Sequence, residues 1–297
     1  MCKNANFSKK RGGGKTAELF AVGASKVLAV DDGYDSFGEE SDFDIDNYEF
    51  PTLDDCPLCM CPMPIDNRKI EYMICCGKIL CRACSSDHAV KSLERGIDVD
   101  TLTRCVFCRS TRADSDTEIV EALKAAIERR DNSAFYQLVQ VYENGQYGLP
   151  VNYQKAFEMY HQSTKLGNAN AAYALGYSYM HGDIVRMDKK KARRLFSRAA
   201  KGGCLGSLHQ LGVMTFRDGG KNLDFLPYFF TAAELGWKDS MDQIKLIHDY
   251  GLVSEEDYKL TLKRHLDAVK KEQSASRNKV VAQINVERAQ RKQRPIG

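Results

Sequence analysis

The apolar positions in the second half of the chain recur with a period that predicts stacked pairs of helices. Leu138, Leu175 and Leu211 lie 37 and 36 residues apart, and a glycine-bearing loop separates two helical stretches in each unit. Small residues recur at similar steps, including Gly176 and Gly212, where two helices would approach closely. A helix pair of this length cannot bury its apolar face alone, so neighbouring pairs must cover it. We therefore expect three repeats of an α-solenoid at 131–238.

Helical patterns also flank the repeats. At 117–130 apolar residues recur at three- and four-residue spacing, which predicts a linking helix with Thr117 as its N-cap. Residues 239–262 carry a similar stripe and are expected to cap the stack. Residues 263–297 hold ten Lys/Arg against three Asp/Glu without a strong apolar stripe. We expect a basic tail there, helix-prone or disordered, and solvated.

Charge is distributed unevenly over the first 55 residues. Residues 1–30 are basic, whereas residues 31–55 contain eleven Asp/Glu and no Lys/Arg, with aromatic residues between them. Such a composition buries too little apolar surface to fold alone, so 1–55 is expected to be a disordered basic and then acidic arm. The acidic part either stays in solvent, docks on a partner or folds back on a basic surface. The net charge of the whole chain, +3, gives no case for nucleic acid.

The N-terminus and the hydropathy predict the compartment. No stretch approaches the roughly 18 apolar residues of a membrane span. Lys9, Lys10 and Arg11 precede no unbroken apolar core, so no secretory signal is recognised. We expect an intracellular protein, cytoplasmic or nuclear, without a membrane partner.

Nine of the eleven cysteines fall between Cys56 and Cys108. One of them is the single Cys61, and the others form three C-x-x-C pairs and one doublet: Cys56/Cys59, Cys75–Cys76, Cys81/Cys84 and Cys105/Cys108. A C-x-x-C pair brings two thiolates onto one tetrahedral ion, which is how structural zinc sites are built. Disulfides are the alternative, but intracellular thiols stay reduced. The sequence therefore predicts a small zinc-stabilised module at 56–110.

The order of these cysteines resembles that of RING fingers, in which ligand pairs alternate between two zinc ions. The resemblance implies a RING-like α+β fold for the module. The resemblance implies a first site with four thiolates: Cys56, Cys59, Cys81 and Cys84. It implies a second site that contains Cys76, Cys105 and Cys108. RING fingers usually place a histidine at the position of Lys78, which cannot ligate. The eighth ligand is then Cys75, with His88 as the alternative, and Cys61 is a spare thiol.

RING fingers mostly act as ubiquitin-protein ligases that position a ubiquitin-charged conjugating enzyme and form no covalent intermediate themselves. The resemblance implies a contact surface for the conjugating enzyme. It contains an aliphatic residue between the first two ligands, Leu58, and an apolar pair between the last two, Val106 and Phe107. An arginine after the last ligand, Arg109, and a helix residue, Val90 or Leu93, complete it. The family prefers proline at the position of Val106 and often has tryptophan on the helix.

The helical repeats resemble Sel1-like repeats, which are related to tetratricopeptide repeats, at 172–183 and 190–203. A RING finger followed by such repeats is similar to a group of proteins from diatoms and related algae. Solenoids of this kind bind peptides or proteins on a concave face. The resemblance thus implies an unidentified protein substrate on the solenoid.

Two functional hypotheses follow for this mainly α chain. In the first, it is a single-chain ubiquitin ligase: two zinc ions shape the module, which binds a conjugating enzyme and ubiquitin, and the solenoid selects the substrate. In the second, it is a zinc-stabilised adaptor without ligase activity. Nucleic-acid binding ranks third, since the basic residues gather in the tails rather than around the cysteines.

Overall fold

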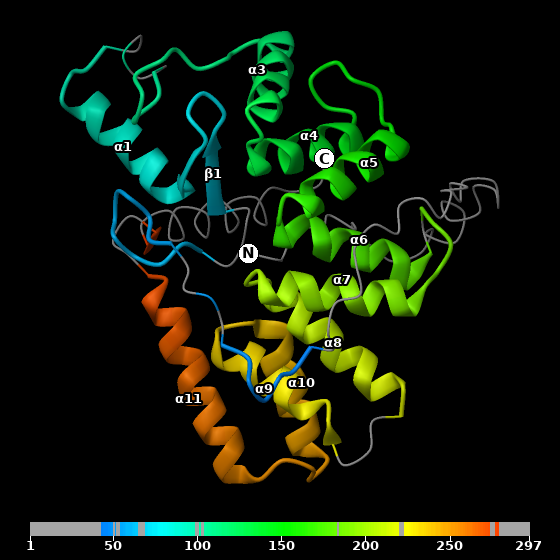
Figure 1. The fold of residues 1–297 in the computed structure, drawn as a ribbon. Helices are drawn as coiled ribbons and strands as arrows, with labels where there is room; N and C mark the ends of the chain where they lie inside the picture. Colours follow the sequence, from blue (N-terminus) through cyan, green and yellow to red (C-terminus); the bar gives the residue numbers. More distant parts are fainter. Residues whose placement is uncertain are drawn as a thin grey trace, which may run out of the picture.

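The computed structural model is mainly helical, as predicted, and its described part contains one two-stranded sheet. It describes residues 43–49, 51, 54–64, 69–98, 101, 104–182, 184–219, 223–273 and 277–278. The cysteine module, residues 56–110, lies beside the first helices of a long helical stack (Figure 1). Within the described ranges, each helix is too short or too polar to cross a bilayer.

The cysteine module is built on one hairpin and one helix. Its elements are β1 (Ile70–Met73), β2 (Lys78–Cys81) and α1 (Arg82–Glu94). The strands pair antiparallel, with Ile70 opposite Cys81. Met63 and Leu80 are its largest fully buried side chains, and half of the buried residues in its core cluster are cysteines. Such a small apolar core needs additional cross-links to be stable.

The helices that follow pack on one another in chain order. They are α3 (Asp116–Glu128), α4 (Asn132–Asn144), α5 (Tyr153–Lys165), α6 (Ala169–His181), α7 (Lys189–Lys201), α8 (Leu205–Arg217), α9 (Leu226–Glu234), α10 (Lys238–Asp249) and α11 (Glu255–Lys271). Helix α11 also contacts α9, so the last elements close the stack. The cap expected at 239–262 is thus α10 with α11, and α11 continues into the segment expected to be a tail.

Capping side chains repeat with the helices and explain where they begin. Asp131 and Asn168 cap α4 and α6, and Asn152 and Asp188 cap α5 and α7; each side-chain oxygen accepts from backbone N–H groups two or three residues on. These bonds satisfy donors that a helix N-terminus leaves open. Helices α8 and α9 begin without a side-chain cap. The first two helix pairs are therefore more regular than the third.

Helix α3 begins earlier than the sequence predicted. The Ser115 hydroxyl accepts from the backbone N–H of Glu118 at 3.3 Å and is the N-cap. The prediction of Thr117 as N-cap is wrong, because Thr117 already lies inside the first turn.

Glycines let successive helices approach, as predicted. A Cβ on Gly176 of α6 would lie 2.8 Å from the ring of Phe196 on α7. A Cβ on Gly212 of α8 would lie 3.0 Å from the ring of Phe229 on α9. The same pairing of glycine with an aromatic ring in two successive units shows that their packing is repeated as well as their sequence.

The cysteine module is attached to both ends of the stack. On one side, the Tyr72 hydroxyl donates to Oδ2 of Asp131 at 2.6 Å, and Tyr72 and Ile74 pack against the apolar cluster of α3 and α4. On the other side, Figure 1 shows the end of α11 reaching the loop of 54–64. There the Cys61 Sγ lies 3.7 Å from the carbonyl oxygen of Gln273. The module is therefore held between the beginning and the end of the solenoid.

The acidic arm folds back on the helices where the structure describes it. Phe43, Ile45 and Tyr48 are half-buried and pack against the main core of the stack. Residues 43–49 are thus packed on the stack, although the whole arm was expected to be disordered. Residues 1–42 lie outside the described residues. Of the outcomes weighed for the acidic stretch, the structure shows the fold-back.

Candidate metal centre

Eight cysteines come together in two groups, and the sulfur atoms within each group lie within 4.8 Å of one another. The first group is Cys56, Cys59, Cys81 and Cys84, and the second is Cys75, Cys76, Cys105 and Cys108. Along the chain the cysteines come in four pairs: Cys56/Cys59, Cys75/Cys76, Cys81/Cys84 and Cys105/Cys108. The first and third pairs form one group, and the second and fourth pairs form the other. The two groups therefore interleave, so each group ties together two distant parts of the module.

Two of the pairs lie in knuckles of the same backbone geometry. The N–H of Met60 donates to the carbonyl of Cys56 at 2.8 Å, and the N–H of Arg109 donates to the carbonyl of Cys105 at 3.0 Å. Met60 and Arg109 both adopt left-handed φ values, 53° and 63°. Each knuckle is closed by an isolated bridge, Asp55 with Pro62 and Arg104 with Thr111. The chain curls in each so that both sulfurs point to one side.

The doublet lies in the turn between β1 and β2, which has a related geometry. The N–H of Gly77 donates to the carbonyl of Met73 at 2.8 Å, and Gly77 has a φ of 71°. This turn brings the sulfurs of two adjacent residues to one cluster. The Cys75 Sγ lies 3.5 Å from that of Cys108, and the Cys76 Sγ lies 3.8 Å from that of Cys105.

The spacing of the sulfurs fits a tetrahedral zinc ion. Zn–S bonds of about 2.3 Å place tetrahedral sulfurs about 3.8 Å apart, close to the 3.5 and 3.8 Å of the second group. All eight donors are thiols, the ligand type that structural zinc sites favour. Both clusters could therefore hold a metal ion and are compatible with zinc.

The surroundings of the thiols shift their pKa values in different directions. Partial burial raises the pKa of the Cys75 and Cys84 thiols, and hydrogen bonds with neighbouring cysteines raise it further. Hydrogen bonds to Ser110 instead lower the pKa of Cys108 to about 6. A divalent cation bound to either group would favour the thiolate form of each cysteine.

The structure places the alternative ligands away from the second cluster. His88 is exposed on α1 and belongs to neither group. The ammonium of Lys78 lies 5.1 Å from the centre of the Phe107 ring, where it makes a cation–π contact. The Cys61 thiol approaches the carbonyl of Cys59 at 3.4 Å and also stands outside both groups. The geometry thus favours Cys75, and its ligation stays a prediction.

The residues expected to contact a conjugating enzyme are not equally exposed. Leu58, Val90 and Leu93 are 42%, 41% and 54% exposed. Val106 and Phe107 instead pack partly against the core of the module. Arg109 is exposed. The aliphatic residues of the first knuckle and of α1 are therefore open to a partner, whereas the pair in the last knuckle also contributes to packing.

Sequence reasoning missed one residue beside the first cluster. Arg277 is largely buried, and its guanidinium lies near enough to the Cys81 thiol to oppose the rise in that thiol's pKa that burial causes. Four thiolates around one divalent ion carry a net negative charge, which a neighbouring guanidinium offsets. The excess of positive charge at 263–297 was the available signal, but we expected a solvated tail. Arg277 contacts the module instead.

Comparison with known proteins identifies the repeats. Residues 136–168 and 169–204 match the family model described as Sel1 repeat. The first stretch contains α5 and most of α4, and the second contains α6 and α7. Chitin synthase regulatory factor 2 of Schizosaccharomyces pombe is 28% identical over 86 residues, which are 29% of this chain and 17% of that protein. The chain thus spans less than a fifth of that relative's length.

Two solved structures resemble part of this chain. A Sel1 repeat protein from Oxalobacter formigenes is 20% identical, with 64% of this chain and 73% of that chain covered and a TM-score of 0.46. A protective antigen of uropathogenic Escherichia coli that displays an SLR fold is 23% identical, with 62% and 40% covered and a TM-score of 0.46. The family match lies within the helical stack, so the interpretation of the cysteine module rests on its own geometry.

Proposed function

We propose that this protein, which contains Sel1 repeats, is a RING-type ubiquitin-protein ligase. In this proposal the cysteine module holds two zinc ions and docks a ubiquitin-charged conjugating enzyme, and the solenoid recruits the substrate. The observation that carries the proposal is the interleaving of the two four-cysteine groups along the chain. This is the arrangement of ligands that the resemblance to RING fingers implies.

Exposed side chains on the module support a docking surface. Leu58 stands between the first two cysteines, and α1, with Val90 and Leu93 exposed, follows β2 directly. Arg109 follows the last cysteine and is exposed. A RING finger supplies no nucleophile, so its contribution is to hold the thioester in a reactive pose. Exposed apolar groups and one arginine suit that role.

The attachment of the module to the stack supports a joint role for both parts. The bond between Tyr72 and Asp131 joins the hairpin to the residue that caps α4. A substrate on the solenoid would thereby be held at a fixed distance from a conjugating enzyme on the module. Positioning of this kind raises the effective concentration of one reactant near the other.

The second candidate function is a zinc-stabilised adaptor that assembles proteins without transferring ubiquitin. Two features favour it. Val106 stands where RING fingers prefer proline, and α1 has the sequence RACSSDHAVKSLE, without an aromatic residue at the expected contact. Phe107 is also partly committed to the core of the module.

Ubiquitin transfer in vitro distinguishes these functions. Zinc-loaded full-length protein is incubated with activating enzyme, ubiquitin and a panel of conjugating enzymes, and chain formation is followed. Leu58→Ala and Arg109→Ala should each lower the rate by about tenfold, the size of a lost contact of about 1.4 kcal/mol. Met60→Ala is the matched control, because Met60 is 71% exposed in the same knuckle but is not a predicted contact.

Each variant is first shown to bind as much zinc as the wild type. Loss of activity in both contact variants, with Met60→Ala unaffected, supports the ligase. A folded, zinc-loaded wild type that transfers no ubiquitin with any enzyme of the panel would favour the adaptor.

A further inference from the structure

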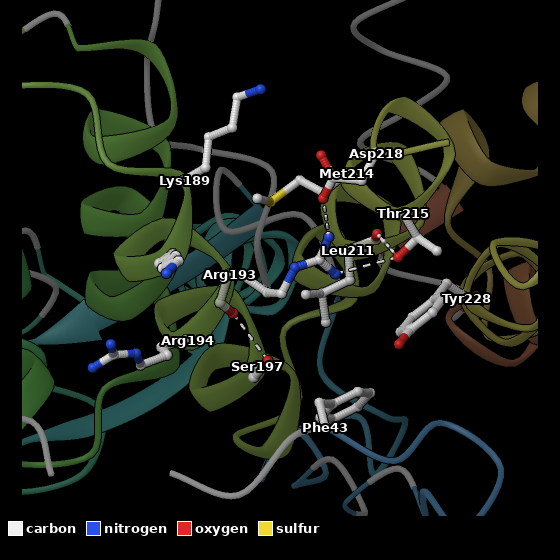
Figure 2. A pocket seen from close by; sticks show the side chains of 11 residues that line it. Phe43, Lys189, Arg193, Arg194, Ser197, Leu211, Met214, Thr215, Asp218 and Tyr228 are labelled. Atoms are coloured by element: carbon white, nitrogen blue, oxygen red, sulfur yellow. Dashed lines mark hydrogen bonds and ion pairs between the residues drawn. The ribbon is translucent and has the colours of Figure 1, made fainter. Parts of the chain in front are cut away.

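A short acidic segment of the chain itself occupies a surface of the solenoid. This self-ligand segment, residues 43–49, lies across α7, α8 and α9. The Phe43 ring stacks with that of Tyr228 at 6.2 Å between centres, and Figure 2 shows the two rings side by side. The Tyr48 hydroxyl donates to the carbonyl oxygen of Ala200, at the end of α7, at 2.6 Å. Two aromatic side chains therefore anchor the segment.

The segment is shaped by its own side chains. The carboxylate of Asp44 accepts from the backbone N–H of Asp46 at 3.0 Å and from Nδ2 of Asn47 at 2.7 Å. This turn brings the rings of Phe43 and Tyr48 to 5.0 Å from each other. Asp44, Asp46 and Asn47 remain exposed while both rings face the helices. A turn of this kind is encoded locally, so a separate peptide with the same sequence could adopt it.

The surface beside the segment is basic and hollow. A cavity of about 590 Å³ lies there, and four cations of α7 line it together with Phe43: Lys189, Lys190, Arg193 and Arg194. Arg193 is paired with Asp218 at 2.6 Å and bonds Thr215, as the dashed lines in Figure 2 show. Lys190 and Arg194 are exposed one helical turn apart. The cavity thus offers positive charge to an acidic peptide beyond what residues 43–49 fill.

We propose that the groove formed by α7, α8 and α9 is the partner-binding site of the solenoid. Its partner is an acidic peptide with two aromatic side chains arranged as in Phe43 and Tyr48, and the self-ligand segment competes with that peptide. This inference rests on the proposed function only in that the solenoid recruits partners. The segment is half-buried rather than fully buried, so an external peptide of the same chemistry can replace it.

Competition has a direct consequence for affinity. A segment tethered in the same chain acts at an effective concentration in the millimolar range. A free peptide must overcome this concentration, so its apparent affinity for the wild type is low. When the segment is weakened, the same peptide should bind more tightly.

The test uses a fluorescent peptide with the sequence of residues 42–50 and full-length, zinc-loaded protein. Fluorescence anisotropy compares the wild type with the double variant Phe43→Ala, Tyr48→Ala. We expect the double variant to bind the peptide at least about tenfold more tightly. Thermal unfolding of both proteins is recorded to show that the double variant remains folded.

Charge reversal in the double variant identifies the groove. Lys190→Glu with Arg194→Glu should weaken binding by at least about tenfold, since both cations line the cavity. The matched control is Lys124→Glu with Lys245→Glu, which changes the net charge equally at exposed positions on α3 and α10. This control should bind as before.

Three results would overturn the proposal. The double variant binds the peptide no more tightly than the wild type, the charge reversals have no larger effect than their control, or a peptide with both aromatic residues replaced by alanine binds equally well. The last result would mark a non-specific anion-binding surface. Because the assay contains no ubiquitin or conjugating enzyme, its failure would leave ligase activity untested, and an inactive ligase would not affect its outcome.

Discussion

Cys75 and Cys76 show how local backbone geometry decides what a residue can bind. Adjacent side chains in a strand point to opposite faces, and they cannot converge on one ion. These two cysteines lie in the turn between β1 and β2, where Gly77 takes a left-handed φ of 71° and the chain curls. Both sulfurs thereby reach the cluster with Cys105 and Cys108.

Loss of Cys75 should empty one site and spare the other. We expect Cys75→Ser to bind one zinc ion per chain where the wild type binds two, because three thiolates and a hydroxyl hold zinc much more weakly. Elemental analysis of reduced, desalted protein measures the ratio. Cys61→Ser is the control and should keep both ions, since Cys61 lies outside the clusters. Equal zinc content in all three proteins would exclude Cys75 as a required ligand.

Gly77 has a second role at the contact between the module and the stack. A Cβ on Gly77 would lie 2.6 Å from Oδ2 of Asp131, the oxygen that also accepts from Tyr72. Asp131 caps α4, so it cannot move without losing these bonds. Gly77→Ala should therefore destabilise the protein through both strain and a clash.

A second glycine separates these two effects. Gly96 has a φ of 72°, but a Cβ there would meet no atom within 4 Å. Gly96→Ala should cost only the left-handed strain, on the order of 1 kcal/mol. Gly77→Ala should cost more by about 1–3 kcal/mol, the usual range for overpacking. Chemical denaturation of both variants measures the difference, and equal losses would show that the module does not press on Asp131.

Within the helix pair α4–α5, a partly buried polar contact joins the two helices. The Tyr160 hydroxyl of α5 donates to Oε1 of Glu143 on α4 at 3.0 Å, and Nε2 of Gln140 lies 3.2 Å from Oε2. Burial raises the pKa of Glu143 to about 7, although the hydrogen bond from Tyr160 opposes the shift. In the next pair the position of Tyr160 is taken by Phe196, which packs on Gly176 without such a bond.

The raised pKa of Glu143 makes the stability of this pair depend on pH. Because the folded state holds the proton more tightly, the contribution is fully present below the ordinary pKa of 4.5 and is lost as pH rises through about 7. Glu143→Gln should remove this loss and be more stable than the wild type at pH 8. The gain is at most about 3 kcal/mol, from 1.36 kcal/mol per pKa unit.

Denaturant unfolding from pH 5 to 8 checks this expectation. Glu121→Gln, at an exposed position on α3, is the control and should follow the wild type. A pH profile of Glu143→Gln parallel to that of the wild type would contradict the assignment.

At the scale of the whole molecule, the cysteine module connects elements from opposite ends of the stack. Tyr72 and Ile74 pack against α3 and α4. Pro62 and Met63 line a cavity of about 510 Å³ together with residues of α9 and α11. The stack has apolar cores of its own, whereas the module has only a small one, half of whose buried residues are cysteines.

Chelation should therefore unfold the module and leave the repeats folded. Structural zinc in small domains contributes roughly 10–16 kcal/mol of apparent binding free energy, more than this small apolar core can replace. After treatment with a strong chelator, limited proteolysis should cut within 56–110 and spare α4–α9. Circular dichroism should retain most of the helical signal. Survival of both parts would refute metal-dependent folding, and readdition of zinc to the chelated protein should restore resistance.

Sequence reasoning predicted the features that depend on local pattern. The 36- and 37-residue period anticipated the helical stack because Leu138, Leu175 and Leu211 must all be buried by neighbouring pairs. By resemblance to a known ligand order, it also anticipated the first group of four cysteines and three members of the second, Cys76, Cys105 and Cys108, that the structure brings together. It could not choose between Cys75 and His88, because that choice depends on how the hairpin turns. It also placed the N-cap of α3 at Thr117 instead of Ser115, since both are good caps and only the backbone distinguishes them.

The sequence alone was sufficient to predict the helices and the interleaving of the thiols. The helices follow from the short-range periodicity of apolar and small residues, and the interleaving follows from the spacing of the cysteines and its resemblance to that of RING fingers. Three contacts join residues that lie 59 to 196 positions apart in the chain. They are the packing of residues 43–49 on α7–α9, the approach of Arg277 to Cys81 and the hydrogen bond of Tyr72 to Asp131. Local sequence carries no signal for such pairs. Only the folded backbone, which brings distant charges and rings within reach of each other, decides them.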